Sequence, residues 1–63
     1  MDEKFSERIK EIILEIGGAK ELSRRSGVTD RAIGSYKLNE SDPSRKNLIA
    51  IAEAANVELL WLA

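Results

Sequence analysis

The polar side chains with the most binding chemistry to offer are Asp30, Arg31 and Ser35, which lie close together in the chain. In a helix these three face outward, because Ile33 and Tyr36 of the same segment point toward a core. An exposed arginine can donate two hydrogen bonds to O6 and N7 of guanine, which is worth about 1–3 kcal/mol of discrimination between bases. Aspartate can accept from N4 of cytosine, and serine can bond to a base or a phosphate. Side chains of these types are therefore able to bind the edges of nucleic-acid bases.

Plainer interpretations of the same residues stay open. Arg31 can be solvated or paired with Asp30, and Asp30 can simply stabilise the positive end of its helix. Ser35 can be merely exposed. Gly34 costs about 1 kcal/mol of helix stability relative to alanine, which suggests close approach of DNA or of another helix.

A second set of residues suits the phosphate backbone. Arg45 and Lys46 gain from the positive end of the helix that we expect to begin there, and Lys37 adds a further cation. The arginines Arg24 and Arg25 are equally compatible with a solvated face. The expected phosphate contacts are Thr29, Lys37, Asn39, Arg45 and Lys46.

Two short helices joined by a turn must position these groups. Ser23 is small where the two helices come close, Gly27 can take the left-handed conformation that ends the first helix, and Thr29 can cap the second. The side chains expected to point inward are Leu22, Val28, Ile33 and Tyr36. This spacing, over about residues 19–38, is typical of a helix-turn-helix, which places its second helix in the DNA major groove.

The rest of the chain predicts three more helices. Ser6 is a candidate N-cap for a helix over 7–16, which Gly17 and Gly18 end. Ser44 can cap a helix over 45–55, and Asn56 can end it. A short fifth helix follows over 57–62, with Trp61 in the core. The apolar stripe of the first helix comprises Phe5, Ile9, Ile12, Ile13 and Ile16. No segment alternates like a strand, so we expect a compact all-α domain of five helices over residues 1–63.

Composition narrows the function further. The chain has 63 residues, no cysteine and no histidine, which excludes disulfides and the usual soft metal sites. Without a glycine-rich phosphate loop, and with a core too small for a closed pocket, it is not expected to be an enzyme. We therefore expect no cofactor, metal or small-molecule substrate. No apolar run approaches the ~18 residues of a membrane span, and the charged N-terminus lacks the core of a signal peptide, which predicts a cytoplasmic location.

The formal net charge is −1, which is low for a DNA-binding protein, but its distribution is uneven. Residues 1–19 hold three bases against five acids, whereas residues 20–46 hold seven bases against four acids. Residues 47–63 add two acids and no base. Positive charge is thus concentrated on the segment expected to meet phosphate. Because the total number of positive charges is low, we expect one domain to bind DNA with modest affinity and two subunits to share the phosphate contacts.

From about residue 6 to 62 the chain resembles the lambda-repressor-like DNA-binding domains of the Cro/C1 or XRE type, and in particular the N-terminal domains of phage-type repressors. Two blocks carry the resemblance: Leu22-Ser23…Gly27-Val28-Thr29…Ile33…Tyr36, and Pro43-Ser44…Leu48…Ile51-Ala52…Ala55-Asn56-Val57…Trp61-Leu62. It implies that helix 30–38 is the recognition helix, with Asp30, Arg31 and Ser35 toward bases. Ala19 stands where many relatives have a glutamine bound to phosphate, so at most its backbone N–H is left for that contact.

Two leucines, Leu14 and Leu60, fall opposite the expected core stripes. Related repressor domains often dimerise weakly through their last helix, although single exposed leucines are also common. The favoured function is a repressor domain that binds a palindromic operator as a dimer, with half-sites about 34 Å apart. The alternative is an antitoxin- or adaptor-like protein-interaction module that keeps the fold. Phage-type repressors usually continue into a C-terminal domain, so regulation is expected to reside beyond residue 63.

Overall fold

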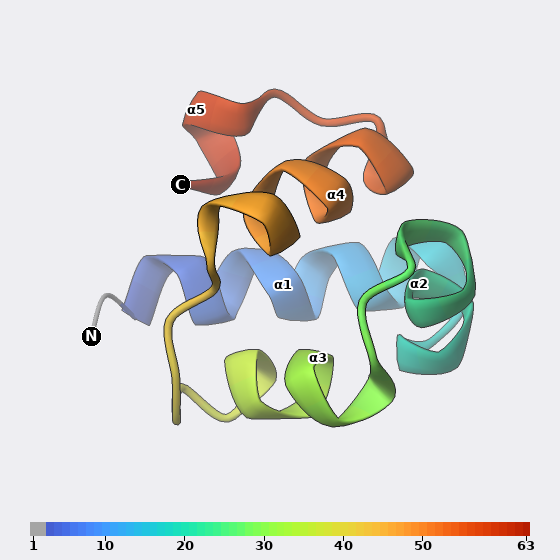
Figure 1. The fold of residues 1–63 in the computed structure, drawn as a ribbon, viewed down its shortest axis with the longest axis horizontal. Coiled ribbons are helices and arrows are strands. Elements are labelled where there is room, and N and C mark those ends of the chain that lie inside the picture. The colour runs from blue at the N-terminus through green and yellow to red at the C-terminus, as the bar shows by residue number, and fades with distance from the viewer. Residues whose placement is uncertain (1–2) are drawn as a thin grey trace.

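The computed structural model describes residues 3–63 and forms five helices over that range (Figure 1). They are α1 (Glu3–Ile16), α2 (Ala19–Ser26), α3 (Asp30–Lys37), α4 (Arg45–Ala55) and α5 (Leu59–Leu62). Residues 3–63 contain no strand, so the predicted all-α fold is confirmed. Within the same residues, no helix combines the length and the apolar character that crossing a bilayer requires.

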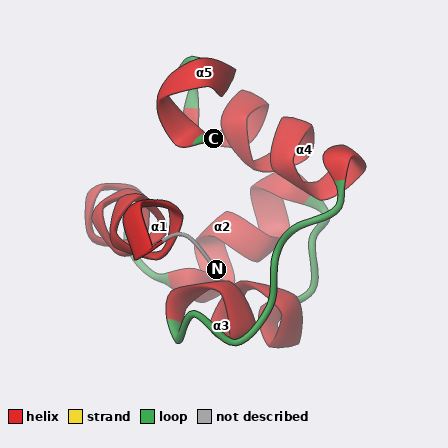
Figure 2. Cartoon of the chain, turned by 90° about the vertical axis from the view of Figure 1, so that its left-hand side faces the viewer, coloured by secondary structure: helices red, strands yellow, loops and turns green. Residues whose placement is uncertain are grey.

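Each helix contributes one completely buried side chain to a shared core. The five residues with 0% exposure are Ile9, Leu22, Ile33, Ile51 and Leu62. Burial of one such side chain stabilises the fold by about 1.5–3 kcal/mol. α1 packs against α2, α3 and α5, while α4 packs against α2 and α5. Consequently α3 lies at one edge of the molecule and α5 at the opposite edge (Figures 1 and 2).

The first helix starts earlier than the sequence predicts, and the predicted N-cap at Ser6 is wrong. α1 already begins at Glu3, so Ser6 lies inside its first turns. Ser6 is buried, and its Oγ donates to the Lys37 carbonyl at 2.8 Å. The last carbonyls of a helix have no partner within that helix. Ser6 therefore satisfies the end of α3 instead of the start of α1.

The other helix ends follow the local chemistry of the sequence. Gly27 ends α2 with φ 79°, and Asn56 ends α4 with φ 56°. Thr29 Oγ1 accepts from the Ala32 N–H and Ser44 Oγ from the Asn47 N–H, each at 3.1 Å. These caps were all expected from residue type.

Trp61 departs from its predicted place in the core. Its side chain is 40% exposed, and Leu62 is the residue of α5 that is fully buried. The guanidinium carbon of Arg8 lies 5.4 Å from the centroid of the Trp61 ring, a cation–π arrangement. A four-residue helix can turn only one narrow face inward, and Leu62 occupies it.

Candidate nucleic-acid interface

The turn between α2 and α3 is held by serine side chains as well as by its glycine. Ser23 Oγ donates to the Val28 carbonyl at 2.6 Å, and the Val28 N–H donates to Ser26 Oγ at 3.1 Å. Val28 itself is buried. Ser23 is thus small enough for the helix contact and also closes the turn. The predicted helix-turn-helix is confirmed, because α2 packs against α3 and hydrogen bonds close the turn between them.

The opposite faces of α3 differ sharply. Ile33 and Tyr36 are buried, and the Phe5 and Tyr36 rings meet edge-to-face with centroids 5.7 Å apart. Asp30 and Arg31 are exposed, and neither takes part in an ion pair among the described residues. The plainer interpretation in which Arg31 pairs with Asp30 is therefore not supported. Arg31 keeps all five of its N–H donors available.

Ser35 and Gly34 complete the outward side of α3. Ser35 is half-buried, and its Oγ lies 2.6 Å from Ser41 Oγ in the following loop. An added Cβ at Gly34 would meet no atom within 4 Å. Close approach of another helix of residues 3–63 therefore does not account for this glycine.

The predicted phosphate contacts lie at helix ends. Arg45 and Lys46 are exposed on the first turn of α4, and Lys37 is exposed on the last turn of α3. Ala19 is the first residue of α2, where Gly18 offers no side-chain cap, so the N–H groups of that turn can meet an anion. Thr29 is exposed and uses its hydroxyl oxygen as the cap of α3.

Asn39 is less accessible than the predicted phosphate contacts Thr29, Lys37, Arg45 and Lys46. It is half-buried, with φ 60°, and its Oδ1 is buried without a hydrogen-bond partner among the described atoms. Its observed role is to reverse the chain after α3, which asparagine tolerates better than most residues. Phosphate contact by Asn39 stays a prediction.

Three residues that help to place α3 were missed by the sequence interpretation. Ser6 binds the carbonyl at the end of α3, Ser41 binds Ser35, and Asn47 Nδ2 donates to Tyr36 Oη at 2.9 Å. All three reach α3 from other elements of the chain. Helical periodicity within one segment does not predict hydrogen bonds between residues of different elements. The only sequence signal is the run of polar residues just before and at the start of α4, which could have been searched for hydrogen-bond partners of α3.

The arginines of α2 are engaged with a carboxylate. Glu21 accepts from Arg24 Nε at 3.1 Å and from Arg25 Nε at 2.6 Å. Hydrogen bonds from Arg24, and then from Arg25, lower the pKa of Glu21 from its ordinary 4.5 to about 2. The same contact raises the pKa of Arg24. These two arginines therefore belong to a local charge cluster with Glu21.

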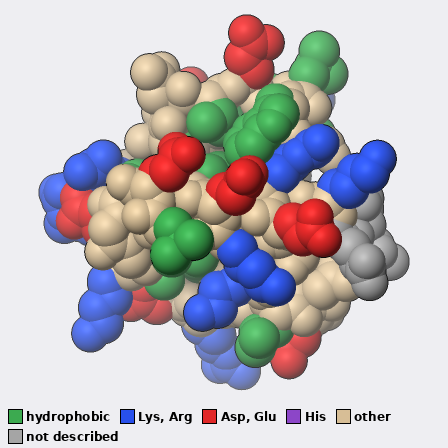
Figure 3. All heavy atoms as spheres, turned by 180° about the vertical axis from the view of Figure 1, so that it is seen from behind, with side chains coloured by type: hydrophobic (Ala, Val, Ile, Leu, Met, Phe, Trp, Pro, Cys, Tyr) green, Lys and Arg blue, Asp and Glu red, His purple; other side chains and the backbone are tan. Residues whose placement is uncertain are grey.

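Seen from behind, Lys and Arg side chains are interspersed with Asp and Glu side chains (Figure 3). The α1 residues Glu7, Lys10 and Glu11 are all exposed. Such a mixed surface attracts a polyanion weakly. The cations at the C-terminal end of α3 and at the N-terminal start of α4 are therefore the better candidates for phosphate contact.

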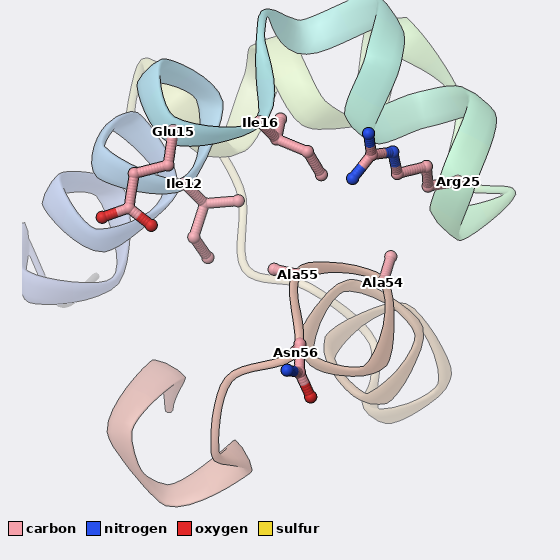
Figure 4. A pocket seen from close by; sticks show the side chains of 7 residues that line it. All are labelled: Ile12, Glu15, Ile16, Arg25, Ala54, Ala55 and Asn56. Carbon is pink, nitrogen blue, oxygen red and sulfur yellow. The ribbon is translucent and has the colours of Figure 1, made fainter.

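A hollow between α1, α2 and α4 has different chemistry (Figure 4). Its lining residues are Ile12, Glu15, Ile16, Arg25, Ala54, Ala55 and Asn56. The walls are largely aliphatic, and none of these side chains is a hydroxyl or thiol nucleophile. Residues 3–63 also hold no group of three or more Asp, Glu, His or Cys that could bind a metal ion. We therefore take the outward face of α3, with the adjacent helix ends, as the candidate site.

Comparison with known proteins identifies the arrangement. A family model described as helix-turn-helix matches residues 9–62. The chain is also 41% identical over 61 residues to an uncharacterized HTH-type transcriptional regulator of Haemophilus influenzae. The match covers 97% of this chain and 26% of that protein, so the chain spans about a quarter of its relative. No solved structure gives a significant match. The chain belongs to the Cro/C1-type helix-turn-helix family of DNA-binding transcription regulators.

Proposed function

We propose that residues 1–63 form the DNA-binding domain of a transcriptional repressor of phage or prophage type, which binds a palindromic operator as a dimer. The observation that carries the proposal is Arg31, an exposed arginine without an ion pair among residues 3–63, on a helix whose other face is locked into the core. Its planar fork of donors matches O6 and N7 of guanine. Such an operator would be reached in the cytoplasm.

The dimensions of α3 support insertion into a major groove. An α-helix with its side chains is about 10–12 Å across, which fits the ~12 Å width of the groove, and the eight residues of α3 extend about 12 Å along their axis. Asp30 and Arg31 stand at its first turn, the part of a recognition helix that usually meets base edges. A rigid docking surface follows from the burial of Ile33 and Tyr36 beneath it.

The charge distribution supports a division of affinity and specificity between different residues. Lys37, Arg45 and Lys46 are exposed cations that suit phosphate, whereas Arg31 suits a base. Each phosphate neutralised contributes about −0.9 to the slope of log affinity against log salt. Because three cations are few, a dimer is needed to reach useful affinity for an operator.

The proposal is tested by measuring the affinity of the protein for a duplex selected from a random pool, at a series of salt concentrations. Arg31→Ala should flatten the preference among sequences, whereas Lys46→Ala should weaken all sequences alike and reduce the salt slope by about 1. Arg24→Ala is the charge-matched control, because Arg24 is bound to Glu21, and it should leave the sequence preference intact. Equal affinity of the unaltered protein for every duplex would reject the proposal.

The dimer is proposed to form through α5. Leu60 is 88% exposed, and its chain neighbours Leu59 and Trp61 are 41% and 40% exposed, so α5 exposes more apolar side chain than the surroundings of Leu14 do. Leu14 is 83% exposed, but Lys10 and Glu11 precede it by one turn and two glycines follow it. Leu60→Glu should therefore abolish self-association in sedimentation, and Leu14→Glu should leave it unchanged. The reverse result would move the interface to α1.

The competing function is a protein-interaction module that keeps the fold. Its support is the net charge of −1 together with the exposed leucines. It predicts no measurable duplex binding even at low salt. The same salt titration therefore distinguishes the two functions.

A further inference from the structure

The chain folds back on α3 as soon as the helix ends. Asn39 takes the left-handed conformation, its N–H donates to the Tyr36 carbonyl at 3.1 Å, and the Glu40 N–H donates to the Ser35 carbonyl at 2.9 Å. This pair of bonds is the Schellman arrangement, which reverses the chain direction. Figure 2 shows the loop leaving the end of α3 and passing along the molecule to α4.

Because of this reversal, Ser41 comes to lie against the recognition helix. Its Oγ is 2.6 Å from Ser35 Oγ, and both residues are half-buried. Ser35 is four residues beyond Arg31, so the two project from the same side of α3. The hydroxyl pair therefore stands one helical turn from the exposed guanidinium.

The bond changes what Ser35 can offer to DNA. Each serine has one O–H and two lone pairs, and a single serine rotates to donate to one base or to accept from another. The mutual bond uses one of the two protons of the pair. One O–H is left, and its direction is restricted because both oxygens are held.

We propose that Ser41 is a further specificity-determining residue of the DNA interface, acting with Ser35 as one hydroxyl pair that reads one position of the duplex. This inference rests on the proposed function. The alternative is that the bond only anchors the loop of residues 39–44 to α3. An anchor alone changes stability, and with it the affinity for all duplexes equally.

The inference is tested by measuring the affinity of each protein for the selected duplex and for all of its single-base-pair variants. The proteins are wild type, Ser35→Ala, Ser41→Ala, the double variant, and Ser41→Thr, which keeps the hydroxyl. We expect one base-pair position at which wild type shows a preference on the order of tenfold. Ser35→Ala and Ser41→Ala should each remove that preference, the double variant should lose no more than either, and Ser41→Thr should retain it.

Two results overturn the role of Ser41 while leaving the proposed function standing. One is full preference at every position in Ser41→Ala. The other is a lower midpoint of thermal unfolding in that variant with equally weakened binding to every duplex, which identifies an anchor. A wild-type protein without sequence preference overturns the proposed function and this inference together.

Discussion

Replacement of Gly34 by alanine should stabilise the domain. Gly34 lies inside the eight-residue α3 with an ordinary helical backbone, and an added Cβ meets no atom within 4 Å. Without a steric penalty, the gain is the propensity difference of about 0.5–1 kcal/mol. For a domain of this size 1 kcal/mol corresponds to about 4–8 °C, so the midpoint of thermal unfolding should rise by roughly 2–8 °C in circular dichroism.

Gly27→Ala is the matched control, because an added Cβ there also meets nothing within 4 Å. Gly27 differs in its backbone, which has φ 79°, so alanine should destabilise by about 1–2 kcal/mol. If Gly34→Ala lowers the midpoint as Gly27→Ala does, the helical conformation and open space assigned to Gly34 are refuted.

The same Gly34 variant tests the DNA interface. If the groove approaches α3 at this point, the new methyl overpacks the contact at a cost of about 1–3 kcal/mol, which weakens binding by roughly 5- to 150-fold. Higher thermal stability with reduced duplex affinity is the expected pair of results. Higher stability with unchanged affinity would place the DNA away from Gly34.

Two further predictions concern stability. Ser6→Ala leaves the Lys37 carbonyl without its donor and should lower the free energy of unfolding by about 1–3 kcal/mol in urea titrations. Ser44→Ala, which loses an ordinary helix cap, is the comparison and should cost about 1 kcal/mol. An unchanged urea midpoint for Ser6→Ala would show that water replaces the lost hydrogen bond. The pKa of Glu21 is lower in the folded state, about 2 against 4.5, so its contribution to stability is complete above pH 4.5 and is lost as the pH falls toward 2. Glu21→Gln should therefore reduce the loss of stability between those pH values, and an identical acid limb in both proteins would contradict the assignment.

The helix ends were predictable because their chemistry is local. A left-handed residue favours glycine or asparagine, and a helix start favours serine or threonine, so Gly27, Asn56, Thr29 and Ser44 could be placed from residue type. The core could likewise be read from helical spacing, since Ile9, Leu22 and Ile33 recur where one face must be buried.

Other features depend on which elements come together in space. Ser6 looks like a cap for α1 but caps the end of α3, and Ser35 looks freely exposed but meets Ser41. Both contacts are set by packing between elements, which periodicity in one segment does not report. Trp61 was misplaced for a related reason, since a helix as short as α5 buries one side chain and leaves its neighbour at the surface.

The central claim is that the outward surface of α3 from Asp30 to Ser35 docks in a DNA groove. Titration of the isotopically labelled protein with a selected duplex, followed by amide chemical shifts, tests it most directly. We expect the amides of residues 30–35 to shift or broaden most, with smaller changes at the starts of α2 and α4. Unperturbed amides over 30–35, with changes concentrated at α5 or elsewhere, would contradict it.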